Sequence, residues 1–196
     1  MIRRLATYVS AGLALLVVAL ASGCRAAPPP APAAAEFRPT GTVREIMGLM
    51  VDPSADFIWQ SVATTVTAAG IDERRPRTDD EWTMVKRSAM TLVEATNLLL
   101  IDRPTGTKED ISANPNIELS PAEIDVLRQK DPQLWKNFVK ALYDSAIPAL
   151  NAINAKDADA LLNSGEAIDV ACENCHLHYW YPPNRTPPAA PSQRGE

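Results

Sequence analysis

The chain has few of the residues on which disulfide-rich proteins and most enzymes depend. Its 196 residues include three cysteines and two histidines, and 6% are aromatic. Three cysteines are too few for a disulfide framework, and because their number is odd each needs its own explanation. The sequence also lacks a G-x-S-x-G nucleophile motif and a glycine-rich phosphate loop. Since so few groups are available for acid–base or nucleophilic chemistry, we do not expect an enzyme.

Positive charge is also in deficit. The chain carries 19 Lys and Arg against 24 Asp and Glu, which gives a formal net charge of −5. Because binding to nucleic-acid phosphates requires a basic surface, we expect no nucleic-acid partner.

Long apolar runs are missing, apart from a short one near the N-terminus. Residues 13–20 (LALLVVAL) follow Arg3 and Arg4, and small residues then lead to Cys24. This order is typical of an export signal, and the run is too short for a comfortable membrane span. The residues ASGC at 21–24 resemble a bacterial lipobox, in which the cysteine is lipidated and becomes the first residue of the mature protein.

We therefore predict a signal peptide at 1–23 and a lipid anchor on Cys24. An ordinary cleaved signal and an uncleaved anchor are the alternatives. All three export the chain, and the lipoprotein interpretation attaches it to the periplasmic side of a bacterial membrane.

Two proline-rich stretches flank the part of the chain that can fold. Residues 24–37 form an Ala/Pro-rich linker after Cys24, and residues 182–196 form a Pro-rich tail that we expect to be disordered. Proline favours extended backbone, and neither stretch holds enough apolar residues to build a core. The folded domain is therefore predicted at 38–181.

The middle of the chain is predicted to be helical. Thr78 and Glu81 form a capping box, and Asp131 before Pro132 is a second helix start. Apolar residues recur at steps of three and four after each start. Helices are expected at 42–50, 54–68, 79–101, 132–153 and from Asp157 or Asp159 to Tyr179, with a short turn of helix at 121–127 inside a long loop.

These helices predict an all-α fold. The residue pair Asp52-Pro53 separates the first two stretches, because proline ends or bends a helix. No segment is predicted to form a strand. Four long helical elements joined in sequence favour an antiparallel four-helix bundle, in which cofactor sites lie between facing helices.

One motif carries chemistry. Residues 172–176 are Cys-Glu-Asn-Cys-His, the C-x-x-C-H pattern of covalent haem c attachment. On a helix, Cys172 and Cys175 lie side by side and can each form a thioether to one porphyrin, while His176 faces the iron. Two buried thiols without a cofactor, a redox dithiol and a zinc site that also uses His178 are the alternatives.

The place of the motif in the chain points to a family. In small cytochromes of the common type, C-x-x-C-H lies near the start of the mature domain, whereas here it lies on the last helix. The ending CENCHLHY at 172–179 resembles the close of the cytochrome c′ (class II) family. The resemblance implies one haem near the end of a four-helix bundle, with His176 as the proximal iron ligand.

The resemblance also directs attention to the first helix. In family members the sixth iron position is empty, or it is filled by a methionine of that helix. The matching stretch at 43–50 (VREIMGLM) offers Met47 as the first choice and Met50 as the second, and leaves an open position as the alternative. Two departures from the family stand out, because Trp180 replaces a common basic residue and Asp52-Pro53 interrupts the first helix.

Methionine ligation raises the reduction potential of a haem and suits an electron carrier. We therefore expect an exported monohaem cytochrome that meets a redox partner protein and reaches the membrane through its lipid anchor. A five-coordinate module that binds NO or CO, and a haem subunit of a larger membrane-associated oxidoreductase, are the alternatives. Many family members dimerise through the first helix, so the resemblance raises a homodimer as an option.

Overall fold

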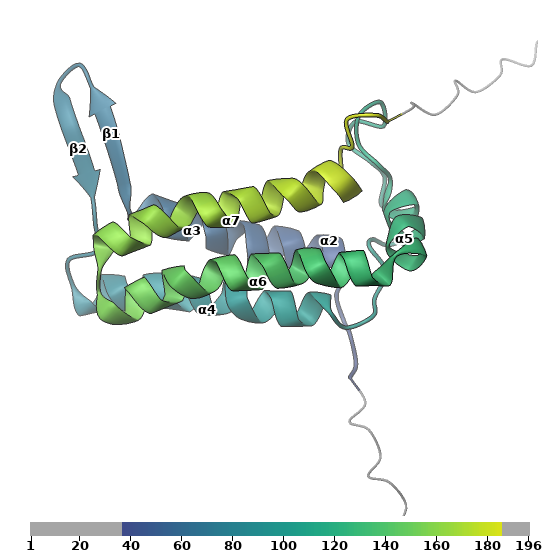
Figure 1. The fold of residues 1–196 in the computed structure, drawn as a ribbon, viewed down its shortest axis with the longest axis horizontal. Helices are drawn as coiled ribbons and strands as arrows, with labels where there is room; N and C mark the ends of the chain where they lie inside the picture. The colour runs from purple at the N-terminus through teal and green to yellow at the C-terminus, as the bar shows by residue number, and fades with distance from the viewer. Residues whose placement is uncertain (1–36, 186–196) are drawn as a thin grey trace, which may run out of the picture. The chain divides into compact units, whose positions relative to one another are not determined.

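The computed structural model describes residues 37–185, so the predictions about the signal peptide, Cys24 and most of both proline-rich stretches lie outside the described residues. The described chain is mostly helical (Figure 1). Its elements are α2 (Val43–Ile46), η2 (Met47–Val51), α3 (Asp52–Ser61), β1 (Ala63–Thr67), β2 (Gly70–Arg74), α4 (Asp79–Leu99), α5 (Pro121–Lys130), α6 (Pro132–Ala155) and α7 (Ala158–Tyr179).

The helix starts follow the caps that the sequence predicts. In α4, the Thr78 hydroxyl accepts from the Glu81 N–H at 3.2 Å, and the Glu81 carboxylate accepts from the Thr78 N–H at 2.8 Å. The Asp131 carboxylate caps α6 by accepting from the Leu134 N–H. Of the two candidate caps for α7, Asp157 is the one that caps it, by accepting from the Ala160 N–H at 2.9 Å. These side chains satisfy N–H groups that helix starts leave without partners.

The sequence predicts a break at Asp52-Pro53, but the structure has none there. Instead, η2 is a π-helical segment that joins α2 to α3, and the Asp52 N–H donates to the Met47 carbonyl, five residues back. Proline lacks an N–H and its ring clashes with the carbonyl four residues earlier in an α-helix. A wider π turn just before Pro53 accommodates that ring, so the helix continues to Ser61.

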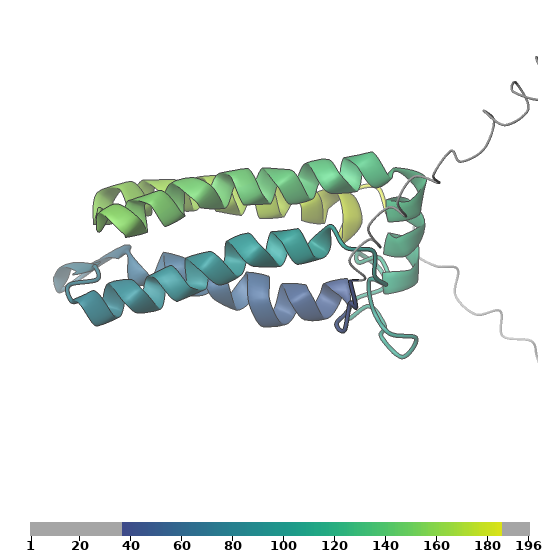
Figure 2. The same cartoon turned by 90° about the horizontal axis from the view of Figure 1, so that it is seen from below.

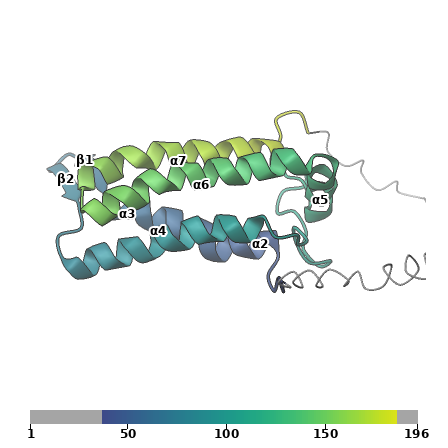
Figure 3. The ribbon, with the colours of Figure 1, turned by 60° about the horizontal axis from the view of Figure 1, so that its bottom comes forward.

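The long helices lie in two layers (Figures 1 and 2). One layer holds α6 and α7, the other holds α4 beside α2–η2–α3, and α4 packs on α6 across the layers. Helix α5 lies across the end of this arrangement (Figure 3). The predicted apolar stripe of α4 is buried in full, at Trp82, Val85, Ala89, Leu92, Thr96 and Leu99. Within residues 37–185, no helix is both long and apolar enough to cross a membrane.

The prediction that the chain has no strands was wrong. Residues 62–74 leave the helical conformation and form an antiparallel hairpin, in which Val66 pairs with Ile71. The predicted helix at 54–68 therefore ends at Ser61. The β-branched run Thr64-Thr65-Val66 favours a strand, and Gly70, at φ +134°, permits the return.

The hairpin projects from one end of the helices (Figure 1). Val66 and Ile71 are 77% and 69% exposed, so they add little to the core.

Replacing both with threonine is expected to change the free energy of unfolding by less than about 0.5 kcal/mol, as surface substitutions do. Urea denaturation would measure this. Leu92→Ala is the control, because Leu92 is fully buried and its loss should cost about 2–5 kcal/mol. A loss above about 1 kcal/mol in the double variant would contradict the account.

Candidate haem site

The three motif residues share one cavity with the first helical stretch. A cavity of about 540 Å³ has Cys172, Cys175 and His176 of α7 on one wall and Met47 of η2 in its lining as well. Its base comes from α4 and α6, through the apolar side chains of Leu99, Trp135, Phe138, Val139 and Leu142. This size and apolar lining suit a cofactor-sized ligand, for which pockets of roughly 300–1,000 Å³ are usual.

The contact between Trp59 and Gly165 brings α3 and α7 together on one side of this cavity. The Trp59 indole N–H donates to the Gly165 carbonyl at 3.2 Å. A Cβ at position 165 would lie 3.0 Å from Trp59 Cδ1, so the missing side chain of glycine is what allows the approach. Trp59 itself lines the cavity, next to Ala55 one turn earlier in the same helix.

Both motif cysteines are free thiols that lie half-buried in the cavity wall. Burial, aided by the carboxylates of Asp169 and Asp52, raises the pKa of Cys172 to about 11. Burial raises the pKa of Cys175 to about 12. The surroundings of both sulfurs therefore favour the thiol over the thiolate.

The His176 imidazole is half-buried in the cavity lining. Burial lowers the pKa of the imidazole, although the nearby carboxylates of Glu173 and Asp52 oppose this effect. A neutral imidazole offers a nitrogen lone pair to a metal, whereas a protonated one does not. The ring contacts Trp180 at 5.1 Å and Tyr181 at 5.9 Å between centroids.

The two candidate methionines differ in their placement. Both pack against the hydrophobic core, but Met47 lines the cavity and Met50 lies outside the lining. The sequence indicated that both would share one face, because residues three apart align on an α-helix. A π segment takes more residues per turn, so Met50 falls short of alignment with Met47.

Arg44 lies at the cavity, whereas His178, the fourth ligand of the alternative zinc site, lies outside it. Arg44 lines the cavity mouth with its side chain 53% exposed, and donates to the Ile111 carbonyl at 3.0 Å. His178 is exposed on the outer side of α7, where its ring lies 5.7 Å from that of Phe138. It is absent from the cavity lining within the described chain.

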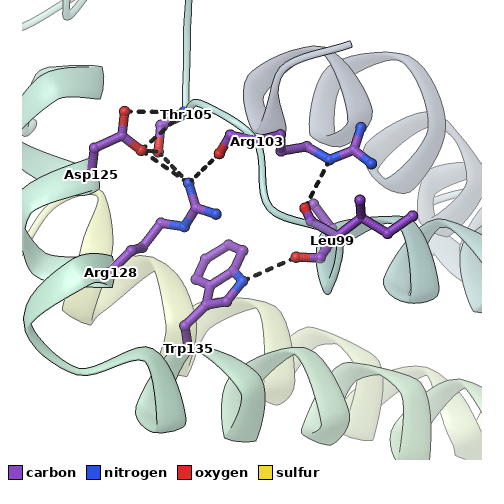
Figure 4. Close-up of polar contacts among 7 residues, drawn as sticks. Leu99, Arg103, Thr105, Asp125, Arg128 and Trp135 are labelled. Carbon is purple, nitrogen blue, oxygen red and sulfur yellow. Dashed lines mark hydrogen bonds and ion pairs between the residues drawn. The ribbon is translucent and has the colours of Figure 1, made fainter. Parts of the chain in front are cut away.

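A cluster around Arg128 supports the cavity base (Figure 4). Arg128 Nη1 donates to Asp125 Oδ1 at 2.9 Å, to the Thr105 hydroxyl at 3.0 Å and to the Arg103 carbonyl at 3.1 Å. The guanidinium carbon lies 4.5 Å from the ring centroid of Trp135, whose indole N–H donates to the Leu99 carbonyl. The cluster therefore connects α5 and the loop after α4 to Trp135, which lies at the start of α6 and lines the cavity.

Nothing in the sequence pattern indicated this cluster or the contribution of the loop at 111–119. Arg128 and Asp125 resemble any charged pair on a helix, and their role depends on a loop some twenty residues earlier in the chain. In the same way, Ser112, Glu118 and Leu119 line the cavity from a stretch without helical periodicity. Only the fold brings these residues to the site.

Models of known protein families give no match to this chain, and no curated protein matches it either. The assignment of the site therefore depends on its residues and their geometry.

Arg128→Ala is expected to lower the free energy of unfolding by about 2–4 kcal/mol, because it removes the partner of Asp125 and the stacking on Trp135. Lys140→Ala is the matched control, since Lys140 pairs with Asp144 on an exposed helix face and should cost less than about 0.5 kcal/mol. Thermal and urea unfolding would measure both variants. Equal losses would mean that the Arg128 cluster adds nothing beyond a surface pair.

Proposed function

We propose that this chain is an exported monohaem c-type cytochrome that acts in electron transfer. Cys172 and Cys175 attach one haem c covalently, and His176 is the proximal iron ligand. Met47 is the distal ligand. The observation that carries the proposal is the shared cavity, which is lined by the C-x-x-C-H residues and by Met47 from a helix far away in sequence.

The residues present fit such a group. Two half-buried thiols one helical turn apart lie beside the His176 imidazole, and the cavity base is apolar. A bound haem would supply one-electron chemistry between ferrous and ferric iron. The chain would hold it through the cysteines, orient His176, and exclude water with the aromatic and aliphatic side chains of α4 and α6. A thioether ligand at Met47 would favour the ferrous state and raise the reduction potential.

The same proposal covers the fold. The two-layer helical arrangement supports an antiparallel four-helix bundle of the cytochrome c′ kind, with the cofactor between the first and last helices. The hairpin between α3 and α4 is an addition that this arrangement accommodates at its end.

Location and partners are also part of the proposal. The signal-like segment and Cys24 support a lipoprotein held on the periplasmic side of a bacterial membrane. Covalent haem attachment takes place on that side, so the two features agree. The redox partner would be a protein that meets the cytochrome transiently, as electron carriers do.

A second candidate function is binding of NO or CO at an open iron position. Gly48 favours it, because this residue lies next to Met47 in the cavity lining and has no side chain.

Optical spectra of the holoprotein separate the two functions. Methionine ligation predicts a weak far-red ferric band and ferrous bands that CO does not shift at once. Met47→Ala should abolish the far-red band and open the iron to CO, because this side chain lines the cavity. Met50→Ala is the matched control and should keep the wild-type spectrum, because Met50 packs outside the lining.

A wild-type spectrum that is high-spin and shifts at once with CO would overturn the Met47 ligand. The gas-binding function would then be favoured. Loss of the far-red band in Met50→Ala but not in Met47→Ala would move the ligand to Met50.

A further inference from the structure

The end of α7 folds back onto the motif histidine. Helix α7 ends at Tyr179, and Trp180 is its C-cap residue. The N–H groups of Trp180 and Tyr181 both donate to the His176 carbonyl, at 2.7 and 3.0 Å. The Trp180 ring lies 5.1 Å from the imidazole at an interplanar angle of 89°. Trp180 thus stands perpendicular to His176 and lines the same cavity.

Burial alone does not explain this position, because Trp180 is 42% exposed. The loop at 111–119 holds the backbone of Trp180 through Leu119. The Leu119 N–H donates to the Trp180 carbonyl at 2.7 Å. The Glu118 carboxylate accepts from the Asn114 N–H and the Ser112 hydroxyl, each at 3.0 Å. The bonds from Asn114 and Ser112 hold the pKa of Glu118 below its ordinary value and fix the loop beside Leu119.

The residues after Trp180 secure the same contact. Arg185 donates from Nε to the Pro115 carbonyl at 3.0 Å, and its two terminal nitrogens pair with the Glu123 carboxylate at 3.1 and 3.3 Å. Its side chain is only 5% exposed. The segment 180–185 is therefore fixed to the loop and to the start of α5, at both of its ends.

A histidine that ligates a metal usually has its second ring nitrogen fixed by a hydrogen bond. Within residues 37–185, no side chain or carbonyl forms such a bond to the His176 imidazole. Its ring contacts are with Trp180 and Tyr181, and the Trp180 contact is the closer of the two. These aromatic contacts therefore restrain rotation of the His176 ring.

We propose that Trp180, whose backbone is held by Leu119, is a positioning residue that sets the orientation of the His176 imidazole as proximal iron ligand. The inference rests on the proposed function, because it assigns a role towards bound haem. It also assigns a role to Trp180, which stands where members of the cytochrome c′ family, which the chain resembles, commonly have a basic residue.

The test uses the full holoprotein and two readouts that depend on ligand orientation. In the ferric protein, the spread of the paramagnetically shifted haem methyl resonances follows the plane of the axial imidazole. The reduction potential responds to the axial ligand and its surroundings. Trp180→Ala is expected to shift both, because the ring is gone. Trp180→Phe keeps a ring and should give a smaller shift.

Trp82→Phe is the control, since Trp82 is buried in α4 and outside the cavity lining. It should leave both readouts at their wild-type values. Wild-type readouts in Trp180→Ala would overturn the inference alone, and so would equal shifts in Trp82→Phe and Trp180→Phe. A wild-type protein without covalent haem would overturn the inference together with the proposed function.

Discussion

The close contact between Trp59 and Gly165 sets the geometry on which the site depends. It brings the first helical stretch against α7 at a point where α7 presents backbone rather than a side chain. Seven residues further along α7, Cys172 faces the cavity, and the cavity continues to Trp180. The two helices therefore meet at Gly165 and hold open space between Met47 and the motif residues, while α4 and α6 close the base with apolar side chains.

The π segment solves a second problem at the same place. Pro53 would interrupt an α-helix, yet the stretch from Val43 to Ser61 must stay continuous to form a cavity wall. The extra residue in the turn accommodates the proline, leaves Met47 in the cavity lining and places Met50 outside it. Irregular turns of this kind recur at functional sites, because they re-aim a single side chain without ending the helix. Here the side chain is that of Met47.

Much of this arrangement could be predicted from local sequence. The capping residues Thr78, Asp131 and Asp157 mark helix starts through hydrogen bonds within four residues, so the sequence alone locates them. The motif at 172–176 likewise depends only on spacing along one helix. The hairpin was missed because its strands are short and exposed, and so lack the alternation of buried and exposed residues that signals a sheet. The Arg128 cluster and the Trp180 contact escaped prediction because distant loops complete them.

Every role proposed for the cavity requires that Cys172 and Cys175 carry a covalent haem. The first measurement is intact-mass spectrometry of protein expressed in a bacterial host that attaches haem c in its periplasm, before and after unfolding and alkylation. We expect a mass increased by one haem and no alkylation of either cysteine, because both sulfurs are thioethers. A protein of unmodified mass, in which both thiols are alkylated after unfolding, would contradict it.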